Sequence, residues 1–217
     1  MKNTSLFTKV FCLVMVANLC YSCQICTCKT INCPAFTDEN FDLWFPYVND
    51  QVLIFQDRNG IADTIIIKNI MRTEQYEGRT GGGYGCGKGC NSSITIYGVQ
   101  STNTEIGKLS IGANKFNITD NSQSLFSNVF LSLKNTSFTA SSISDTGFVN
   151  SENSQPFFTS KFQTSLQIGS KMFSNVQLIQ IDTMVNKPAG AYKLFFSRSN
   201  GLVAWENYSD KSLWIKD

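Results

Sequence analysis

The chain has 217 residues, of which 18 are basic and 16 acidic, and it contains no histidine. Lys2 and Lys9 are the only charged residues before position 23, so the remainder carries equal numbers of basic and acidic side chains. A neutral body has no electrostatic surplus for phosphate backbones, which argues against nucleic-acid binding. The lack of histidine excludes Ser-His-Asp and Cys-His catalysis and His-ligated metals.

The first 22 residues have the pattern of an export signal. Two lysines form a basic front, residues 11–20 are an apolar run, and Ser22 lies at the exit. A membrane-spanning helix needs roughly 20 apolar residues, and no downstream run approaches that length. We therefore expect residues 1–22 to be a signal peptide and the mature protein to lie outside the cytoplasm.

Cys23 is a candidate lipid attachment site. Cleavage after Ser22 would leave Cys23 as the first residue, and a cysteine behind a serine and an apolar run is typical of a bacterial lipoprotein signal. Acyl chains on Cys23 would tether the protein to a membrane. The sequence thus predicts a cell-envelope lipoprotein of the outer membrane or periplasm. A freely secreted protein with the same mature end is the alternative.

The number of cysteines bears on the choice between a lipid-anchored and a freely secreted protein, because six cysteines follow the signal. If none carries lipid, they can form three disulfides in any of fifteen connectivities; a lipid on the first leaves one of the other five unpaired. Four thiolates could instead hold zinc, but an oxidising compartment favours disulfides. We expect one or two bridges to join the N-terminal segment, residues 23–50, to a glycine-rich loop further on. The candidates are Cys26, Cys28, Cys33, Cys86 and Cys90, with Cys23 added if it carries no lipid.

The glycine-rich loop spans residues 78–90, of which seven are glycine. It contains Gly82-x4-Gly87-Lys88, which begins like a phosphate-binding P-loop, but Gly89 stands where Ser or Thr is needed for magnesium. A strand-like sequence follows, whereas a P-loop is followed by a helix. These departures argue against a nucleotide site. They favour a loop restrained by a disulfide, with a ligand-covering flap as the alternative.

From residue 50 onward, short apolar or alternating runs are separated by Asn, Gly, Ser and Asp, a pattern typical of strands joined by turns. The best hairpin signal is Asp57-Arg58-Asn59-Gly60. The only predicted helix is short, at residues 37–44, with Thr37 as its N-cap. Strands are predicted at residues 52–56, 62–70, 93–99, 105–111, 126–133, 157–168, 176–185, 192–197, 202–206 and 212–216.

These ten strands predict an all-β fold in which residues 51–217 form a single β domain. No run between them is long enough for a crossover helix, so the strands should be antiparallel. A single meander closes most simply as a strongly curved sheet or an incomplete up-and-down barrel, with a β-sandwich as the alternative. Alternation places Phe158, Phe162, Leu166 and Ile168 on one face. Residues 135–155, rich in Ser, Thr and Asn, should form an exposed excursion.

Several short motifs lie at the two ends of the chain. They are Cys33-Pro34-Ala35-Phe36, Trp44-Phe45-Pro46-Tyr47, a hairpin on residues 52–55, residues 192–197 (YKLFFS) and Asn200-Gly201-Leu202-Val203. Together these motifs resemble those of uncharacterised exported or lipid-anchored envelope proteins of Bacteroidota. In such proteins a tyrosine-rich strand that ends in Ser precedes a turn and a Gly-Leu-Val segment near the C-terminus. The resemblance implies a β-rich envelope protein from that phylum and brings no activity with it.

Carboxylates are the remaining candidates for chemistry, and they are scattered. Asp57-x-Asn59-Gly60, with Asp63 beyond it, resembles part of a calcium loop but lacks a third oxygen ligand and the closing Glu. Turn chemistry explains these residues without a metal. Glu74 and Glu77 could face one another as a glycosidase pair only on a helix, which their segment does not favour.

Aromatic side chains offer a second kind of site. Tyr97, Trp205 and Trp214 could form a carbohydrate-stacking platform, although aromatic residues of strands more often belong to the core or to an edge. The prediction as a whole is a non-enzymatic, cofactor-free envelope protein that acts by binding or by structure. The alternatives are a soluble, disulfide-stapled module for a small apolar ligand or a carbohydrate, and a carboxylate-dependent hydrolase. An enclosed apolar cavity of roughly 300 Å³ or more would favour a carrier, and a filled interior would favour a structural or interaction role.

Overall fold

Strands make up most of the computed structural model, which describes residues 35–76, 89–100, 109–118, 123–150, 158–181 and 190–217. All of these residues belong to one compact unit. In them the structure has one helix, α2 (Glu39–Trp44), and thirteen strands. The strands are β1 (Val52–Gln56), β2 (Ala62–Tyr76), β3 (Gly89–Gln100), β4 (Leu109–Ile118), β5 (Gln123–Leu133), β6 (Thr136–Ala140), β7 (Ser142–Ser144), β8 (Gly147–Val149), β9 (Phe158–Ile168), β10 (Lys171–Ile181), β11 (Ala191–Ser197), β12 (Gly201–Asn207) and β13 (Leu213–Lys216).

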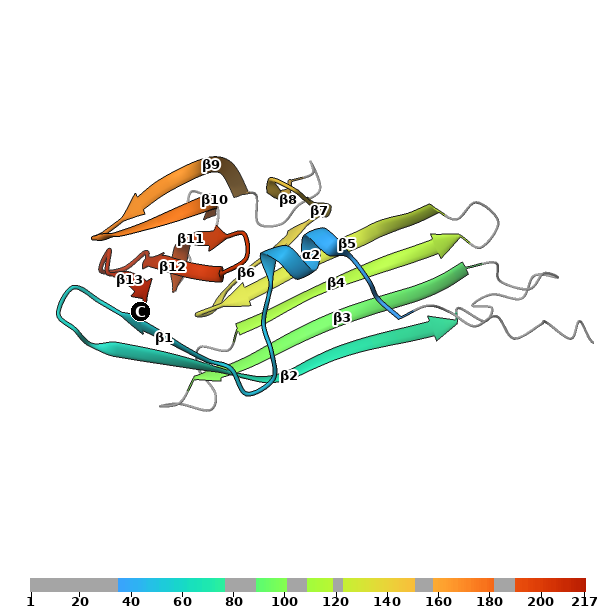
Figure 1. Cartoon of the computed structure of the whole chain (residues 1–217), viewed down its shortest axis with the longest axis horizontal. Helices are drawn as coiled ribbons and strands as arrows, with labels where there is room; N and C mark the ends of the chain where they lie inside the picture. Colours follow the sequence, from blue (N-terminus) through green and yellow to red (C-terminus); the bar gives the residue numbers. More distant parts are fainter. Residues whose placement is uncertain (1–34, 77–88, 101–108, 119–122, 151–157, 182–189) are drawn as a thin grey trace, which may run out of the picture. The chain divides into compact units, whose positions relative to one another are not determined.

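Eleven of the strands form one antiparallel sheet in the order β6-β5-β4-β3-β2-β1-β13-β12-β11-β10-β9 (Figure 1). The chain runs as a meander in each half, and β1 pairs with β13, so its first and last strands are neighbours. Strands β6 and β9 are the two edges, yet the rings of Phe138 and Phe158 on them lie 4.8 Å apart. The sheet therefore curls into an incomplete barrel with one seam between β6 and β9. The predicted all-β, strongly curved antiparallel sheet is confirmed, and the sandwich alternative is wrong.

The predicted hairpin between β1 and β2 is confirmed. A carboxylate oxygen of Asp57 accepts hydrogen bonds from the backbone N–H groups of Asn59 at 2.9 Å and Ile61 at 2.8 Å. Gly60 has a φ of 76°, a backbone conformation that glycine adopts without steric cost. The Asp, Asn and Gly at this site thus stabilise the turn, as their side-chain chemistry predicts.

The exposed excursion predicted at residues 135–155 is wrong, because its described part forms β6, β7 and β8. Few residues here are apolar, but Phe138, Ile143 and Phe148 are each 5% exposed or less. The side-chain amide of Gln177 accepts from the backbone N–H of Phe148 and donates to its carbonyl, so it pairs with β8 as a neighbouring strand would. A polar composition misled the prediction because the few apolar residues occupy the inward positions.

The interior of the curved sheet is filled by the segment that carries α2. Phe36, Phe41, Trp44 and Phe45 are 0–3% exposed and belong to the same core cluster as side chains from both halves of the sheet. Helix α2 begins with Asp38 as its N-cap, whose side chain accepts from the N–H of Phe41. The prediction of Thr37 as the cap was wrong by one residue.

A second, smaller apolar cluster forms where the tip of the β9–β10 hairpin meets β12 and β13. Ile168 and Leu166 pack there with Val203, whereas Phe158 belongs to the main core. The four alternating positions predicted to share one face of β9 are thus divided between two clusters. A two-stranded ribbon twists strongly, and Asn175 on β10 has a φ of 50°, so one face of the ribbon turns along its length.

Tyr47 links the inner segment to β12. Its phenol oxygen accepts a hydrogen bond of 2.8 Å from the buried backbone N–H of Leu202, and its ring occupies the space beside Gly201, where a Cβ would collide with it. Burial raises the pKa of the Tyr47 phenol, and the N–H of Leu202 opposes that shift. The neutral phenol is therefore the form that the fold requires.

Tyr47→Phe is expected to lower the free energy of unfolding by about 1–3 kcal/mol, because it leaves a buried N–H without an acceptor. Urea titrations at neutral pH test this value. Because the pKa of the Tyr47 phenol is raised in the folded state, this group contributes its full stabilisation below about pH 10 and loses it as the pH rises further. The free energy of unfolding of the wild-type protein should therefore fall above that pH, and that of the Phe variant should fall less steeply. Equal stability at neutral pH, or equal alkaline slopes, would contradict this.

Candidate functional site

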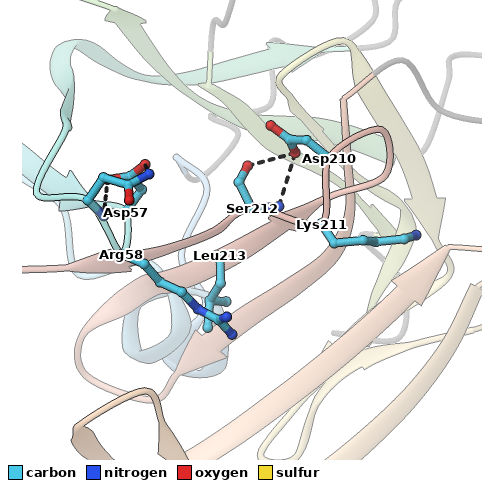
Figure 2. A pocket seen from close by; sticks show the side chains of 7 residues that line it. Asp57, Arg58, Asp210, Lys211, Ser212 and Leu213 are labelled. Carbon is cyan, nitrogen blue, oxygen red and sulfur yellow. Dashed lines mark hydrogen bonds between the residues drawn. The ribbon is translucent and has the colours of Figure 1, made fainter.

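A pocket of about 380 Å³ opens between the β1–β2 turn and the β12–β13 turn (Figure 2). Its carboxylates serve the turns: Asp57 accepts from its own hairpin, and Asp210 accepts from the backbone N–H and the hydroxyl of Ser212. These bonds from Ser212 hold the pKa of the Asp210 carboxyl below its ordinary value. The ammonium of Lys211 lies 4.1 Å from the ring centre of Tyr192. The pocket is thus a polar hollow between two stabilised turns.

The calcium-like motif and its neighbour have structural roles. Asp57, Asn59 and Gly60 close the hairpin, and the Asp63 side chain is ion-paired with Lys134 and 5% exposed. The cation of Lys134 also lies 5.5 Å from the ring centre of Trp205. In the part of the chain that the structure describes, no three His, Cys, Asp or Glu side chains are grouped so as to hold a metal ion.

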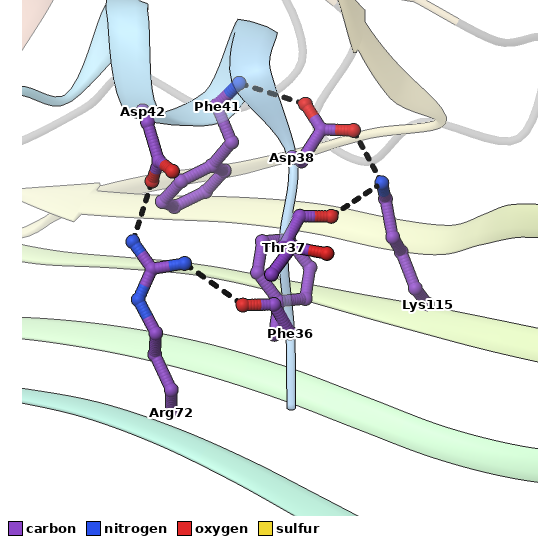
Figure 3. Close-up of polar contacts among 7 residues, drawn as sticks. All are labelled: Phe36, Thr37, Asp38, Phe41, Asp42, Arg72 and Lys115. Atoms are coloured by element: carbon purple, nitrogen blue, oxygen red, sulfur yellow. Dashed lines mark hydrogen bonds and ion pairs between the residues drawn. The ribbon is translucent and has the colours of Figure 1, made fainter. Parts of the chain in front are cut away.

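Two basic residues of the sheet hold the inner segment in place (Figure 3). Arg72 on β2 donates to the carbonyl of Phe36 at 2.8 Å and to the Asp42 carboxylate at 2.6 Å. Lys115 on β4 is ion-paired with Asp38 and donates to the carbonyl of Thr37 at 3.1 Å. Because their hydrogens are directed at these acceptors, both cations act as anchors for the N-terminal side of α2.

The structure does not assemble the predicted aromatic platform, and it describes only one member of the predicted carboxylate pair. Glu74 lies on the strand β2, opposite Ser92, and Glu77 lies outside the described residues. Trp205 is completely buried, and the half-buried Trp214 stacks on it with ring centres 5.8 Å apart. Tyr97 lies on β3 in a different part of the sheet. Trp205 is therefore a core residue, which is the commoner role of aromatic residues in strands.

The predicted cysteine sites are described only at one position. Cys23, Cys26, Cys28, Cys33 and Cys86 lie outside the described residues, so lipidation and disulfide connectivity stay predictions. Cys90 is on β3, where it is 1% exposed. The strand that begins at Gly89 follows the glycine-rich loop directly. A P-loop would be followed by a helix, so this finding agrees with the rejection of a nucleotide site.

One surface stands out by its chemistry: the side of β2–β6 that faces away from the core, called the outer face here. Its inward neighbours, such as Ile94, Ile111 and Leu131, are core residues, and the alternate positions therefore point outward. At its centre the outer face has hydroxyl, amide and aromatic side chains, together with Met71 and Gly112. The charged Lys68 lies at its margin, in the β2 bulge beside Asn69, and is ion-paired with Asp50. Ile66, Val99 and Phe116 occupy further outward positions. The central positions, to which the name outer face refers below, are Asn69, Met71, Thr73, Ser93, Thr95, Tyr97, Ser110, Gly112, Asn114, Asn128, Phe130, Ser132, Ser137 and Thr139.

Sequence reasoning noticed Tyr97 but missed the outer face as a unit. Each strand contributes two or three of its positions, and only the register of five paired strands brings Met71, Thr95, Gly112, Phe130 and Thr139 into one row. The available signal was the absence of charge at every second position of these runs. A pattern of that kind gains meaning only once the pairing is known.

No protein-family model, no curated protein and no solved structure matches the chain. Among the described residues, no helix has the length and apolar character needed to cross a membrane.

Proposed function

We propose that this chain is an exported bacterial cell-envelope protein, anchored by a lipid on Cys23, that acts through binding or structure and does not catalyse a reaction. The export signal, the cysteine that would begin the mature chain and the neutral, histidine-free body support the proposal. The motifs at the chain ends support an origin in Bacteroidota. We expect neither a cofactor nor a nucleic-acid or nucleotide partner.

The observation that carries the proposal is the filled interior. A carrier of the barrel type holds its ligand inside the sheet, in a cavity of some hundreds of Å³. Here the corresponding space contains Phe41, Trp44 and Phe45. The ring of Phe45 packs on those of Phe41, Phe148 and Phe196. This packing leaves the outer surface as the part of the described protein that can meet a partner.

The hydrolase alternative is disfavoured by what the described carboxylates do. Asp38, Asp42 and Asp63 are each ion-paired with a basic residue of the fold. Glu206 accepts from Tyr192 and is ion-paired with Lys193. A general acid and base need side chains that can exchange protons with a substrate, whereas these groups stabilise contacts within the protein.

The main rival is a soluble exported module stapled by disulfides. Its six cysteines would all be oxidised, and the buried position of Cys90 suits a bridge to the N-terminal segment. Both proposals describe an exported protein that binds a partner. They differ in whether Cys23 carries a lipid or a disulfide, and this difference changes the mass of the mature protein.

The full chain with its own signal, expressed in a bacterial host, is expected to mature to residues 23–217 with a lipid-sized mass increment on Cys23. The measurement is intact mass spectrometry, with detergent-phase partitioning and cell fractionation alongside. Cys23→Ser should remove the increment and release the protein, and Cys26→Ser, as the matched control, should keep it. A mature mass without lipid and with six oxidised cysteines would establish the soluble rival. An unprocessed chain in the cytoplasm would overturn both.

A further inference from the structure

We infer that the outer face of β2–β6 is a binding surface for an uncharged polysaccharide. The inference rests on the proposed function, because it names the ligand class of a protein that acts by binding outside the cell. It is carried by three features of the face: its lack of charge, its rows of hydroxyl and amide groups, and one aromatic ring laid across a glycine.

The lack of charge selects the class of partner. Nucleic acids, anionic lipids and acidic glycans are bound through Lys and Arg, and the outer face has neither. The basic residues of these strands have partners within the protein: Arg72 and Lys115 hold the inner segment, and Lys68, at the margin of the face, is ion-paired with Asp50. Lys134, in the β5–β6 turn, pairs with Asp63. An uncharged ligand is the one whose electrostatics match such a surface, because it brings no charge that would have to be desolvated without a partner.

The hydrogen-bonding groups are arranged in rows across the strands. One row is Asn69, Tyr97, Ser110, Ser132 and Ser137, which the strand register places side by side. The five strands, spaced about 4.8 Å apart, make such a row roughly 19 Å long. Hydroxyl groups both donate and accept, and they therefore suit a ligand that presents hydroxyl groups along its length.

A neighbouring row shows that some of these groups are pre-ordered. The hydroxyls of Thr73 and Ser93 are 2.5 Å apart, and Asn114 donates to the Asn128 amide oxygen at 2.7 Å. The bond from Asn114 fixes the orientation of the Asn128 amide, because the Asn128 oxygen accepts it. The Asn128 amide nitrogen has no acceptor in the described part of the chain, so its two hydrogens can be donated to a ligand.

Phe130 supplies an apolar platform between the two rows. The space where a Cβ of Gly112 would lie is occupied by the far edge of the Phe130 ring, with Cζ at 2.1 Å and Cε1 at 2.3 Å from that position. The ring therefore lies across β4, and only glycine permits this. The face of an aromatic ring is electron-rich and attracts the C–H groups of an apolar surface such as that of a pyranose. Met71, in the same row, is 50% exposed.

A protein partner fits the same surface less well. Protein interfaces have a dry apolar centre enriched in Tyr, Trp, Phe, Met and Arg, and they are depleted in Ser. The apolar side chains on this side are spread out: Phe130 and Met71 are separated by Thr95 and Gly112. Phe116 and the Ile66–Val99 pair lie in other rows. A ligand with alternating C–H and O–H groups meets this mixture without leaving hydroxyls buried and unpaired.

The test measures retention of the mature protein on neutral polysaccharides, with cellulose, β-1,3-glucan, xylan and mannan as probes and polygalacturonate as the anionic comparison. We expect retention on at least one neutral polymer. Phe130→Ala and Asn128→Asp should each weaken it about tenfold or more, which corresponds to a loss of about 1.4 kcal/mol. Asn128→Asp keeps the acceptor for Asn114 and tests the surface without removing packing. Asn175→Asp, an exposed position on β10, is the matched control and should bind as the wild type does.

The outcomes separate this inference from the proposed function. No retention on any neutral polymer, retention on the acidic polymer alone, or equal binding by Asn128→Asp and Asn175→Asp would overturn the polysaccharide site and leave the envelope protein standing. Self-association in sedimentation that Asn128→Asp abolishes would assign the face to a second copy and also overturn the site. Release of reducing ends from a retained polymer would overturn the non-catalytic function while the binding site stood.

Discussion

Replacing Asp63 by Asn is expected to lower the free energy of unfolding by about 3–5 kcal/mol, because it leaves a buried cation without its counter-ion. The side chains of Asp63 and Lys134 are only 5% and 17% exposed. Lys134 lies in the turn between β5 and β6, with a φ of 50°, and it crosses to the start of β2. The ion pair therefore joins segments 71 residues apart. Urea unfolding followed by circular dichroism measures the loss.

Two controls make the Asp63 result specific. Asp50→Asn is the matched substitution, since Asp50 forms an exposed ion pair of 3.9 Å with Lys68, and it should cost less than about 1 kcal/mol. The double variant Asp63→Leu with Lys134→Met should recover most of the stability, because an apolar pair of similar size avoids the buried charge. A cost below about 1 kcal/mol for Asp63→Asn, equal to that for Asp50→Asn, would show that the pair contributes no more than a surface contact.

The strand pattern was predictable because it is set by local chemistry. Turn residues such as Asp57 and Gly60 act within a few positions of themselves, and alternating runs mark strands wherever one face is buried. The same reasoning failed at β6–β8, where a few apolar residues at inward positions suffice and where β8 is also held by the Gln177 amide, which pairs with Phe148 from 29 positions away. Glutamine carries no signal of that role in the sequence. The partners of Asp63 and Arg72 were hidden for the same reason.

The candidate surface was less predictable than the fold. In the sequence alone, Phe130 looks like an ordinary strand residue, and Gly112 looks like a glycine that destabilises its strand. Their meaning depends on pairing, because the register places Gly112 directly opposite Phe130 and lets the ring lie over it. The residue types argued against nucleic acid as a partner of this chain. Only the arrangement of the strands could indicate where the proposed uncharged ligand would bind.

Trp44→Ala is expected to cost about 3–5 kcal/mol, the range for truncating a large buried aromatic side chain. Trp44 is completely buried, its indole N–H donates to the carbonyl of Ser144 on β7 at 2.9 Å, and its ring meets Phe162 edge to face. The substitution leaves a cavity and removes the donor to β7. Glu39→Ala, at an exposed position of the same helix, is the matched control and should stay within about 0.5 kcal/mol of the wild type.

The way in which Trp44→Ala unfolds distinguishes two relations between helix and sheet. A helix of six residues is too short to be stable alone, so α2 exists because its aromatic side chains are buried inside the sheet. If the sheet in turn needs this filling, the variant will unfold in one transition with an unchanged m-value, and strand and helix signals will coincide. Separate transitions, or a cost near that of Glu39→Ala, would mean that the sheet closes without its inner segment. We expect the single transition, because Phe45 in the same segment contacts rings from β8 and β11 at once.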